Sequence, residues 1–250
     1  MKYLLSLMMI IISTNIYSQS DSSYHVSLLS QFSIDKASAN GVSYSVYSAE
    51  AIIKKMKYTI VPTYRNKTLQ NMKGNQYGVS LYRSFKKSYL NVDVAYSADM
   101  LFPTWNLHTD YFQSIAKGLE FRVAYNYRSY DVGEVNHMAI MGVSYESHRV
   151  IIHYNAYNAF GQSLSHQFSL RRNLKMPRDY LQISYTNGKD DTMRNVDNVD
   201  NQNSTYRLSL GKNVMKIINL IMTAALSDFT HKDTSTLNVG YMVGIGIDLH

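Results

Sequence analysis

The sequence predicts an all-β protein, an antiparallel transmembrane β-barrel of about fourteen strands. Apolar and polar residues alternate with a period of two in segment after segment, most clearly over 119–128, and this period is that of a strand with one apolar face. The chain has 22 tyrosines against 8 phenylalanines, a preference that suits membrane–water interfaces. After the first twenty residues, no apolar stretch approaches the length of a membrane-spanning helix.

The first residues have the pattern of a secretory signal. Lys2 is a short basic region, Leu4–Ile12 is apolar apart from Ser6, and the following residues are mostly small and polar. We therefore predict a cleaved signal peptide over 1–18 and one barrel domain over 19–250. A retained membrane anchor is the alternative, although the apolar run is about half of the ~18 residues that a spanning helix needs.

Composition limits the function classes. The chain has no cysteine, so disulfides cannot stabilise it and a lipid anchor on cysteine is excluded. Its formal net charge is +7 at pH 7, but the basic residues are scattered and the chain is predicted to be exported. Nucleic acid is therefore not an expected partner.

Strand and turn signals divide the chain into fourteen predicted strands. An even number fits a single-chain bacterial outer-membrane barrel, and twelve strands is the competing prediction. The strands are 24–34, 41–49, 56–65, 75–85, 89–98, 105–115, 119–130, 136–146, 149–159, 162–173, 180–188, 204–213, 217–227 and 236–249.

The connections alternate in character, as a barrel with both termini in the periplasm requires. Predicted periplasmic turns are short and mostly carry lysine; they include 54–55, 86–88, 116–118, 147–148 and 174–179. Predicted extracellular loops are 35–40, 66–74, 99–104, 131–135, 160–161, 189–203 and 228–235. The longest and most polar connection, 189–203, falls on the extracellular side.

The same alternation separates a lipid face from a lumen face. In the last strand, Leu237, Val239 and Tyr241 alternate with Asn238 and Gly240. A water-soluble β-sandwich, which would bury the apolar face between two sheets, is the alternative fold. The tyrosine content, the number of strands and a terminal strand able to close the sheet favour the barrel.

Two segments resemble a known family. The runs YLNVDVAYSADMLFP (89–103) and YFQSIAKGLEFRVAYNYRSY (111–130) resemble the YaiO family of outer-membrane β-barrel proteins, with weaker similarity from Tyr24 to Leu249. The ending Gly244–Leu249 resembles the signal read by the outer-membrane barrel assembly machinery, but His250 replaces the usual terminal aromatic residue. The resemblance implies an outer-membrane barrel and no particular reaction.

Charged residues at the lumen phase of the predicted strands are the candidate site. Rows of mixed sign can pair as a structural plug or line a water channel. These candidate lumen-lining residues are Asp93, His108, Asp110, Glu120, Arg122, Arg128, Arg171 and Arg207; Arg65 has the same phase.

Catalytic and metal-binding patterns are weak. His108 and Asp110 share a strand face, so an aspartate-oriented histidine base is geometrically possible, but a hydrogen-bonded lumen pair is the simpler interpretation. Ser165 and His166 are adjacent and point to opposite faces, so they cannot pair. The loop 189–203 is rich in Asp and Asn, which could hold a hard cation, although its spacing fits no EF-hand and a solvated loop is expected. We expect no enzyme, cofactor or metal.

Three functions remain open at this point. The first is a narrow channel for passive passage of small solutes, with lumen charges setting its selectivity. The second is a structural barrel, or one whose outer loops bind envelope glycans or a partner. The third is a lipid- or glycan-modifying enzyme centred on His108. The expected partners are the outer-membrane lipid bilayer, the assembly machinery during insertion and possible envelope glycans.

Overall fold

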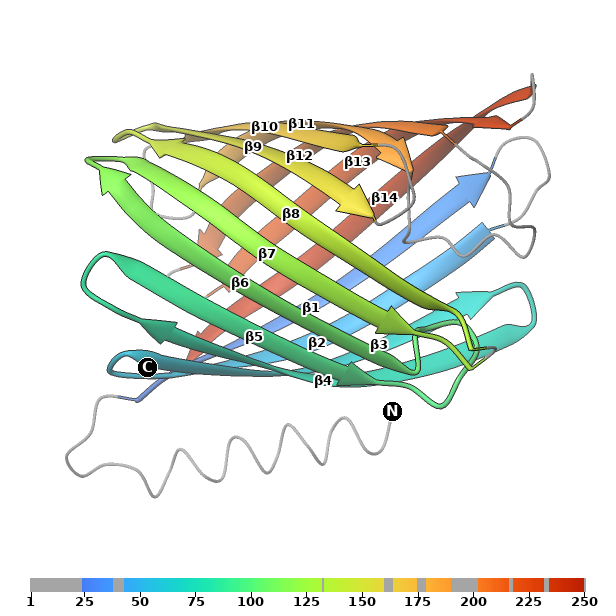
Figure 1. Ribbon diagram of the computed structural model, residues 1–250, viewed down its shortest axis with the longest axis horizontal. Coiled ribbons are helices and arrows are strands. Elements are labelled where there is room, and N and C mark those ends of the chain that lie inside the picture. Colours follow the sequence, from blue (N-terminus) through green and yellow to red (C-terminus); the bar gives the residue numbers. More distant parts are fainter. Residues whose placement is uncertain are drawn as a thin grey trace.

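The protein is a closed antiparallel barrel in which each strand pairs with its neighbours in the sequence (Figure 1). This computed structural model describes residues 24–37, 43–131, 133–159, 164–174, 179–189, 202–215, 218–231 and 234–249. The fourteen strands are β1 (Tyr24–Ala37), β2 (Ser43–Lys55), β3 (Tyr58–Leu69), β4 (Met72–Ser84), β5 (Ser88–Tyr96), β6 (Trp105–Ala116), β7 (Leu119–Ser129), β8 (Val135–Glu146), β9 (Val150–Ala159), β10 (Ser165–Asn173), β11 (Tyr180–Lys189), β12 (Gln202–Met215), β13 (Ile218–His231) and β14 (Thr234–Leu249). The prediction of fourteen strands is confirmed, and the alternative of twelve is wrong.

The barrel closes where β14 pairs with β1. Val26 lies opposite Leu249, and the register continues without a bulge to the pair of Ala37 and Asn238. The start of β1 and the end of β14 therefore lie at the same end of the barrel, which is where an even number of strands returns the chain. Because closure leaves no open sheet edge, every strand can pair on both sides, as a bilayer requires.

Burial along the strands is inverted relative to a water-soluble core. Buried polar side chains on the lumen face include Gln76, Asn91, Asp110, Asn126, Asn155 and Thr205. Large apolar side chains on the outer face are exposed, among them Leu81, Val94, Phe121, Val143, Ile183 and Leu208. The barrel thus presents its apolar residues outward, and the sandwich alternative is wrong. No helix in the described ranges is long and apolar enough to cross a bilayer.

Aromatic side chains form a band on the outer face near one end. The cross-strand register places Tyr64 beside Tyr77 on β3 and β4, and Tyr96 beside Trp105 on β5 and β6. Their ring centroids are 5.4 Å and 4.9 Å apart, respectively. Tyr47 extends the row to β2 at 6.4 Å from Tyr64. Such girdles sit at the headgroup level of outer-membrane barrels, which explains the tyrosine preference of the sequence.

Two predicted extracellular loops are wrong. Of residues 228–235, most are strand, because β13 continues to His231 and β14 begins at Thr234. Residues 66–74 are mostly strand as well: β3 continues to Leu69 and β4 begins at Met72, so only Gln70 and Asn71 connect these two strands. Gln70 adopts the left-handed conformation that this tight turn needs (φ 51°). The polar residues that suggested a loop are instead paired strand residues at the end of the hairpin.

The connection after β5 packs against this extended hairpin. An added Cβ at Gly74 would lie 3.0 Å from the Leu101 Cβ, so a glycine suits this close approach. The backbone N–H of Asn75 donates to Asp99 Oδ2 at 2.6 Å, and the Ser97 hydroxyl donates to the Asn75 carbonyl at 2.6 Å. The LFP segment is therefore fixed to the barrel rim. The long loop predicted at 189–203 falls outside the described residues between Lys189 and Gln202.

The turns at the end that holds Tyr24 and Leu249 are short. Lys117 and Gly118 connect β6 to β7 as predicted, with Gly118 at φ 76°. The turn predicted at Lys54 and Lys55 lies two residues later, at Met56 and Lys57. Their location in the periplasm stays a prediction.

Candidate functional site in the barrel lumen

All eight candidate residues have the lumen phase of their strands. The register pairs Asp93 with His108, Asp110 with Ala124, and Arg122 with Gly142, and these pairs share the inner face with the buried residues Asn91 and Asn126. The same phase continues around the sheet through Arg171 on β10 and Arg207 on β12. The remaining two, Glu120 and Arg128, lie at opposite ends of β7.

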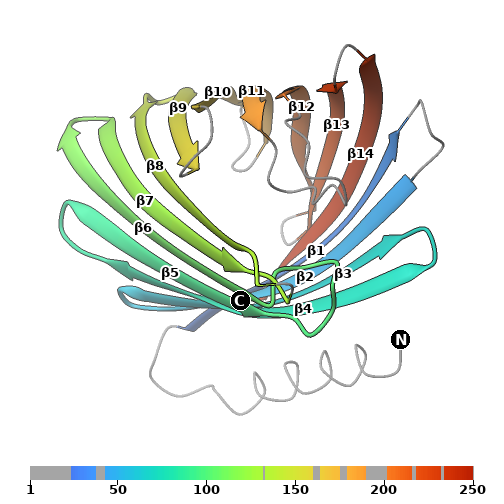
Figure 2. The same cartoon turned by 45° about the vertical axis from the view of Figure 1, so that its right-hand side comes forward.

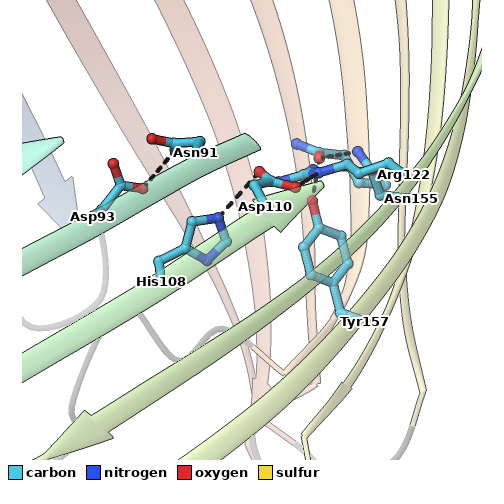
Figure 3. Close-up of polar contacts among 8 residues, drawn as sticks. Asn91, Asp93, His108, Asp110, Arg122, Asn155 and Tyr157 are labelled. Atoms are coloured by element: carbon cyan, nitrogen blue, oxygen red, sulfur yellow. Dashed lines mark hydrogen bonds and ion pairs between the residues drawn. The ribbon is translucent and has the colours of Figure 1, made fainter. Parts of the chain in front are cut away.

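Asp110 and Arg122 form the strongest contact of the lumen (Figure 3). Arg122 donates from Nε to Asp110 Oδ1 at 2.7 Å and from Nη2 to Asp110 Oδ2 at 2.6 Å, a bidentate fork between β6 and β7. His108 Nε2 lies 3.2 Å from Asp110 Oδ2. Asp110 is only 6% exposed, so its charge depends on these two partners.

Arg122 also reaches across a whole strand. Its Nη1 donates to Asn155 Oδ1 on β9 at 3.2 Å, although β8 lies between β7 and β9. The register puts Gly142 of β8 opposite both residues. An added Cβ at Gly142 would lie 2.2 Å from Asn155 Oδ1, so the missing side chain is what lets the two residues meet.

The hydrogen bonds continue onto β10. Asn155 Nδ2 donates to Gln167 Oε1 at 3.2 Å, and the Tyr157 hydroxyl donates to the same oxygen at 2.5 Å. At the other end, Asn91 Nδ2 donates to Asp93 Oδ2 at 2.9 Å on β5. We call this set the polar belt: Asn91, Asp93, His108, Asp110, Arg122, Asn155, Tyr157 and Gln167.

The β5–β6 end of the belt has unsatisfied acceptors. Among the residues that the structure describes, four buried side-chain atoms there have no hydrogen-bond partner: Asn91 Oδ1, Asp93 Oδ1, Asn106 Oδ1 and His108 Nδ1. When Nε2 of His108 carries the proton toward Asp110, all four are acceptors. This part of the wall therefore favours a cation or a hydrogen-bond donor in the lumen.

Beside the belt, aromatic and amide side chains line a cavity of about 380 Å³. Tyr89 and Phe112 stack with centroids 4.1 Å apart, and the Arg122 guanidinium lies 5.3 Å from the Phe112 centroid. The lining residues are Tyr89, Phe112, Arg122, Val143, Ser144, His153, Asn155, Gln167, Ser169 and Gln182.

The other candidate residues lie outside the belt. Arg171 donates from Nε to Asn173 Oδ1 at 3.0 Å, and its guanidinium lies 3.9 Å from the Tyr180 ring centroid. Arg207 is exposed on the lumen face of β12, opposite Ser184 and Ala225.

The lumen face changes character on the other side of the barrel. We call the lumen faces of β5–β7 the charged wall, and those of Asn219–Ser227 on β13 and Gly240–Gly246 on β14 the neutral wall. The neutral wall is formed by Asn219, Ile221, Thr223, Ala225, Ser227, Gly240, Met242, Gly244 and Gly246, and none of these is charged. β6 and β13 are seven strands apart in a closed ring of fourteen, so the two walls face each other (Figure 2).

The structure adds little to a catalytic or metal-binding interpretation. His108 contacts Asp110, but this carboxylate is already held by the Arg122 fork. Ser165 and His166 lie on opposite faces, and His166 instead contacts the Tyr154 hydroxyl at 2.7 Å. Within the described ranges, no group of three or more His, Cys, Asp or Glu side chains is arranged to hold a metal ion.

Sequence reasoning did not identify Gly142, Asn155 or Gln167. Neutral amides at lumen phase look like ordinary filling residues, and a glycine in a strand has many possible reasons. The available signal was the alternation of 150–159, which places Asn155 inward. Only the cross-strand register shows that Gly142 separates it from Arg122.

The sequence over residues 25–191 matches the family described as the YaiO membrane β-barrel domain, which is more than half of the chain. The chain belongs to the YaiO family. The resemblance found in the 89–130 segment is thereby confirmed, and the barrel described above is that of a membrane protein of the outer-membrane type. No curated protein matches this YaiO barrel in sequence.

A solved structure of TM-score above 0.5 shows the same architecture. A bacterial polysaccharide outer-membrane secretin superposes with a TM-score of 0.56 at 6% identity, covering 93% of this chain and 100% of the other. Pseudomonas aeruginosa OpdQ gives a TM-score of 0.49 at 9% identity, covering 92% and 98%. A triple mutant of Rhodopseudomonas blastica porin gives 0.46 at 9% identity, covering 91% and 100%. At 6% identity, the likeness to the secretin describes the fold and not the activity.

Proposed function

We propose that this YaiO barrel is a passive channel for small hydrophilic solutes. The observation that carries the proposal is the contrast between the charged wall and the neutral wall that faces it. The charged wall holds long charged side chains, whereas the neutral wall has no charged residue and includes three glycines, an alanine, a serine and a threonine. A plug of paired charges would need long partners on both sides.

The polar belt supports an open lumen because its bonds run along the wall. Each of its hydrogen bonds joins residues on the same strand, on neighbouring strands or across the single strand β8. The belt therefore holds its side chains against the sheet. Barrel diameter grows with strand number, and fourteen strands lie between side-chain-filled barrels of eight and open porins of sixteen.

The charges of the belt also suggest its selectivity. The Arg122 charge is matched by Asp110, whereas Asp93 keeps one carboxylate oxygen without a hydrogen-bond partner. We expect the β5–β6 side of the lumen to favour cations and hydrogen-bond donors.

Single-channel recording in a planar bilayer tests the proposal, and the absence of native cysteine makes site-directed labelling clean. Ala225→Cys places a thiol on the neutral wall, and Ala224→Cys places one on the lipid face of the same strand. We expect discrete conductance steps from both variants. A charged methanethiosulfonate reagent should then lower the conductance of Ala225→Cys and leave Ala224→Cys unchanged.

Two results contradict the channel. One is a folded barrel, shown by its heat-modifiable band on a gel, that conducts no current. The other is conductance that labelling at residue 225 does not change. Either result would favour a structural or partner-binding barrel, which is the second function that the sequence leaves open.

We also propose that insertion depends on the barrel assembly machinery reading the 244–249 segment. What supports this is its place in the barrel: it belongs to β14, the strand that closes against β1, with Gly246 opposite Leu29. Contact of the rim with envelope glycans is a further proposal, which the fixed Asp99–Thr104 connection would serve as a rigid surface.

A further inference from the structure

We infer that the cavity beside the polar belt is a subsite for an uncharged, hydroxyl-rich solute, a saccharide of one or two rings. The inference rests on the proposed channel, because a solute reaches this wall through the lumen. The cavity of about 380 Å³ lies within the range of about 300–1,000 Å³ that small-molecule sites occupy.

Several polar groups of the lining have no partner in the protein. Gln167 Oε1 already accepts two hydrogen bonds, from Asn155 and Tyr157, and this orients the amide and leaves its nitrogen as a donor. Ser169, only 7% exposed, and Gln182 make no side-chain hydrogen bond within the part of the chain that the structure describes. Donors and acceptors of these side chains therefore face the cavity, on the opposite side of the belt from the free acceptors of β5 and β6.

The charge of the lining indicates a neutral ligand. Its only permanently charged residue is Arg122, whose Nε and Nη2 are committed to Asp110 and whose Nη1 donates to Asn155. Because the buried, bidentate Asp110 already matches this charge, a carboxylate or phosphate ligand would find no unmatched positive charge in the lining. A cationic ligand would find its acceptors on β5, at Asp93, outside this lining.

The aromatic pair Tyr89 and Phe112 gives the cavity an apolar surface that suits a saccharide ring. Tyr89 and Phe112 stack with an interplanar angle of 14° and both line the cavity, next to the amides of Asn155, Gln167 and Gln182. A pyranose ring has an apolar C–H face and a rim of hydroxyls, so it can pack on aromatic carbon while its hydroxyls bond to amides. A simple ion or a flexible polyol would leave the aromatic surface unused.

Equilibrium binding to the refolded full-length barrel in detergent tests the inference without requiring conductance. Maltose is titrated calorimetrically into the wild type and into Gln182→Leu, which removes the amide and keeps the side-chain size. We expect about tenfold weaker binding for the variant, the ratio that one lost neutral hydrogen bond gives. Ser169→Ala, which also leaves the belt contacts in place, should weaken binding in the same direction and serves if Gln182→Leu does not fold.

Thr186→Val is the matched control. Thr186 has the same lumen phase on β11, four residues from Gln182, and does not line the cavity. It should bind maltose like the wild type. The inference is overturned if maltose does not bind, if Gln182→Leu and Thr186→Val bind equally, or if sodium glucuronate or spermidine binds more tightly than maltose. A barrel that conducts but does not bind maltose loses the subsite alone, whereas a barrel that binds maltose but never conducts loses the channel alone.

Discussion

The charged wall and the neutral wall have the same backbone and opposite chemistry. Both consist of antiparallel strands that present alternate residues to lipid and lumen, and both have apolar outer faces. On the charged wall the inward residues bond to one another across strands, and Asp110 is buried among them. On the neutral wall the inward residues are mostly short, and Thr223 and Ser227 share hydrogen bonds with hydroxyl groups of β12.

The difference shows that strand pairing fixes the shape of this barrel while side-chain length fixes the space inside it. The long residues of the charged wall are held by their neighbours, and the neutral wall opposite them presents mostly short side chains to the lumen. Substitutions test this difference between the walls. The largest effect is expected at Arg122, a smaller one at Gly142 and Gly246, and the smallest at Asp179.

The largest effect is expected from Arg122→Met on the charged wall. Removing the guanidinium leaves the Asp110 carboxylate buried beside His108 alone, and breaking such a pair costs about 3–5 kcal/mol. Urea unfolding of the barrel in phospholipid vesicles measures this loss. Arg207→Met, which changes an exposed lumen arginine beside the neutral wall, should change the free energy of unfolding by less than about 0.5 kcal/mol.

A second substitution tests whether the buried charge of Asp110 causes the loss of stability. Asp110→Asn combined with Arg122→Met should recover part of the stability, because the buried group is then uncharged. Equal losses for Arg122→Met and Arg207→Met would mean that the two arginines have the same role, and the distinction between the walls would fail.

A smaller effect is expected at two inward-facing glycines. At Gly142 an added methyl group would collide with Asn155 Oδ1 at 2.2 Å, whereas at Gly246 the nearest atom is Leu29 Cδ1 at an ordinary 3.7 Å. Gly142→Ala should therefore cost about 1–3 kcal/mol. Gly246→Ala should stay within about 0.5 kcal/mol of the wild type in the same urea assay. Similar values for both would show that Arg122 and Asn155 do not depend on the gap at Gly142.

The smallest effect is expected at Asp179, which precedes β11 in the part of the barrel between the two walls. Lys212 Nζ donates to Asp179 Oδ2 at 2.6 Å, the backbone N–H of Asn213 donates to Oδ1 at 2.7 Å, and these contacts lower the pKa of the carboxyl below its ordinary value. Since the folded pKa is the lower one, the contact stabilises the barrel above about pH 4 and is lost as the pH falls through the folded value.

Asp179→Asn should therefore remove part of the acid sensitivity of unfolding. We expect its urea midpoint to be slightly below that of the wild type at neutral pH and to converge with it in acid. A difference that does not change with pH would assign the effect to side-chain packing at the turn, not to the charge of Asp179.

The sequence predicts the barrel well because its main signal is local. Alternation over ten residues predicts both the strand and its inward face, and in the structure Asp110, Arg122 and Arg207 have the phase that it predicts. Polarity alone was a poor guide to loops, as the β3–β4 hairpin shows, because strands that leave the membrane can stay paired while turning polar.

Contacts between strands were harder to predict. Whether Arg122 meets Asp110 or another lumen residue of β6 depends on register, and register follows from turn geometry and bulges such as the one between Ser114 and Ala116. The contact between Arg122 and Asn155 requires the β7–β8 register, the β8–β9 register and the glycine at position 142. Alternation predicts the face on which a residue lies, but it does not predict the height of that residue along the barrel axis.

The order of strand pairing also bears on how the barrel forms. Thirteen of the fourteen strand pairs join segments that follow one another in the chain, and only the pair of β1 and β14 joins remote ones. Hairpins can therefore form early and add in sequence, while ring closure at roughly 5 kcal/mol of chain entropy comes last. Because Val26 and Leu249 are partners, a linker between them would give a circular chain, which could be reopened at the turn of Lys117 and Gly118. Such a circular permutant keeps every strand neighbour and every lumen residue, so the lumen face depends on which strands pair and not on the order in which the chain connects them.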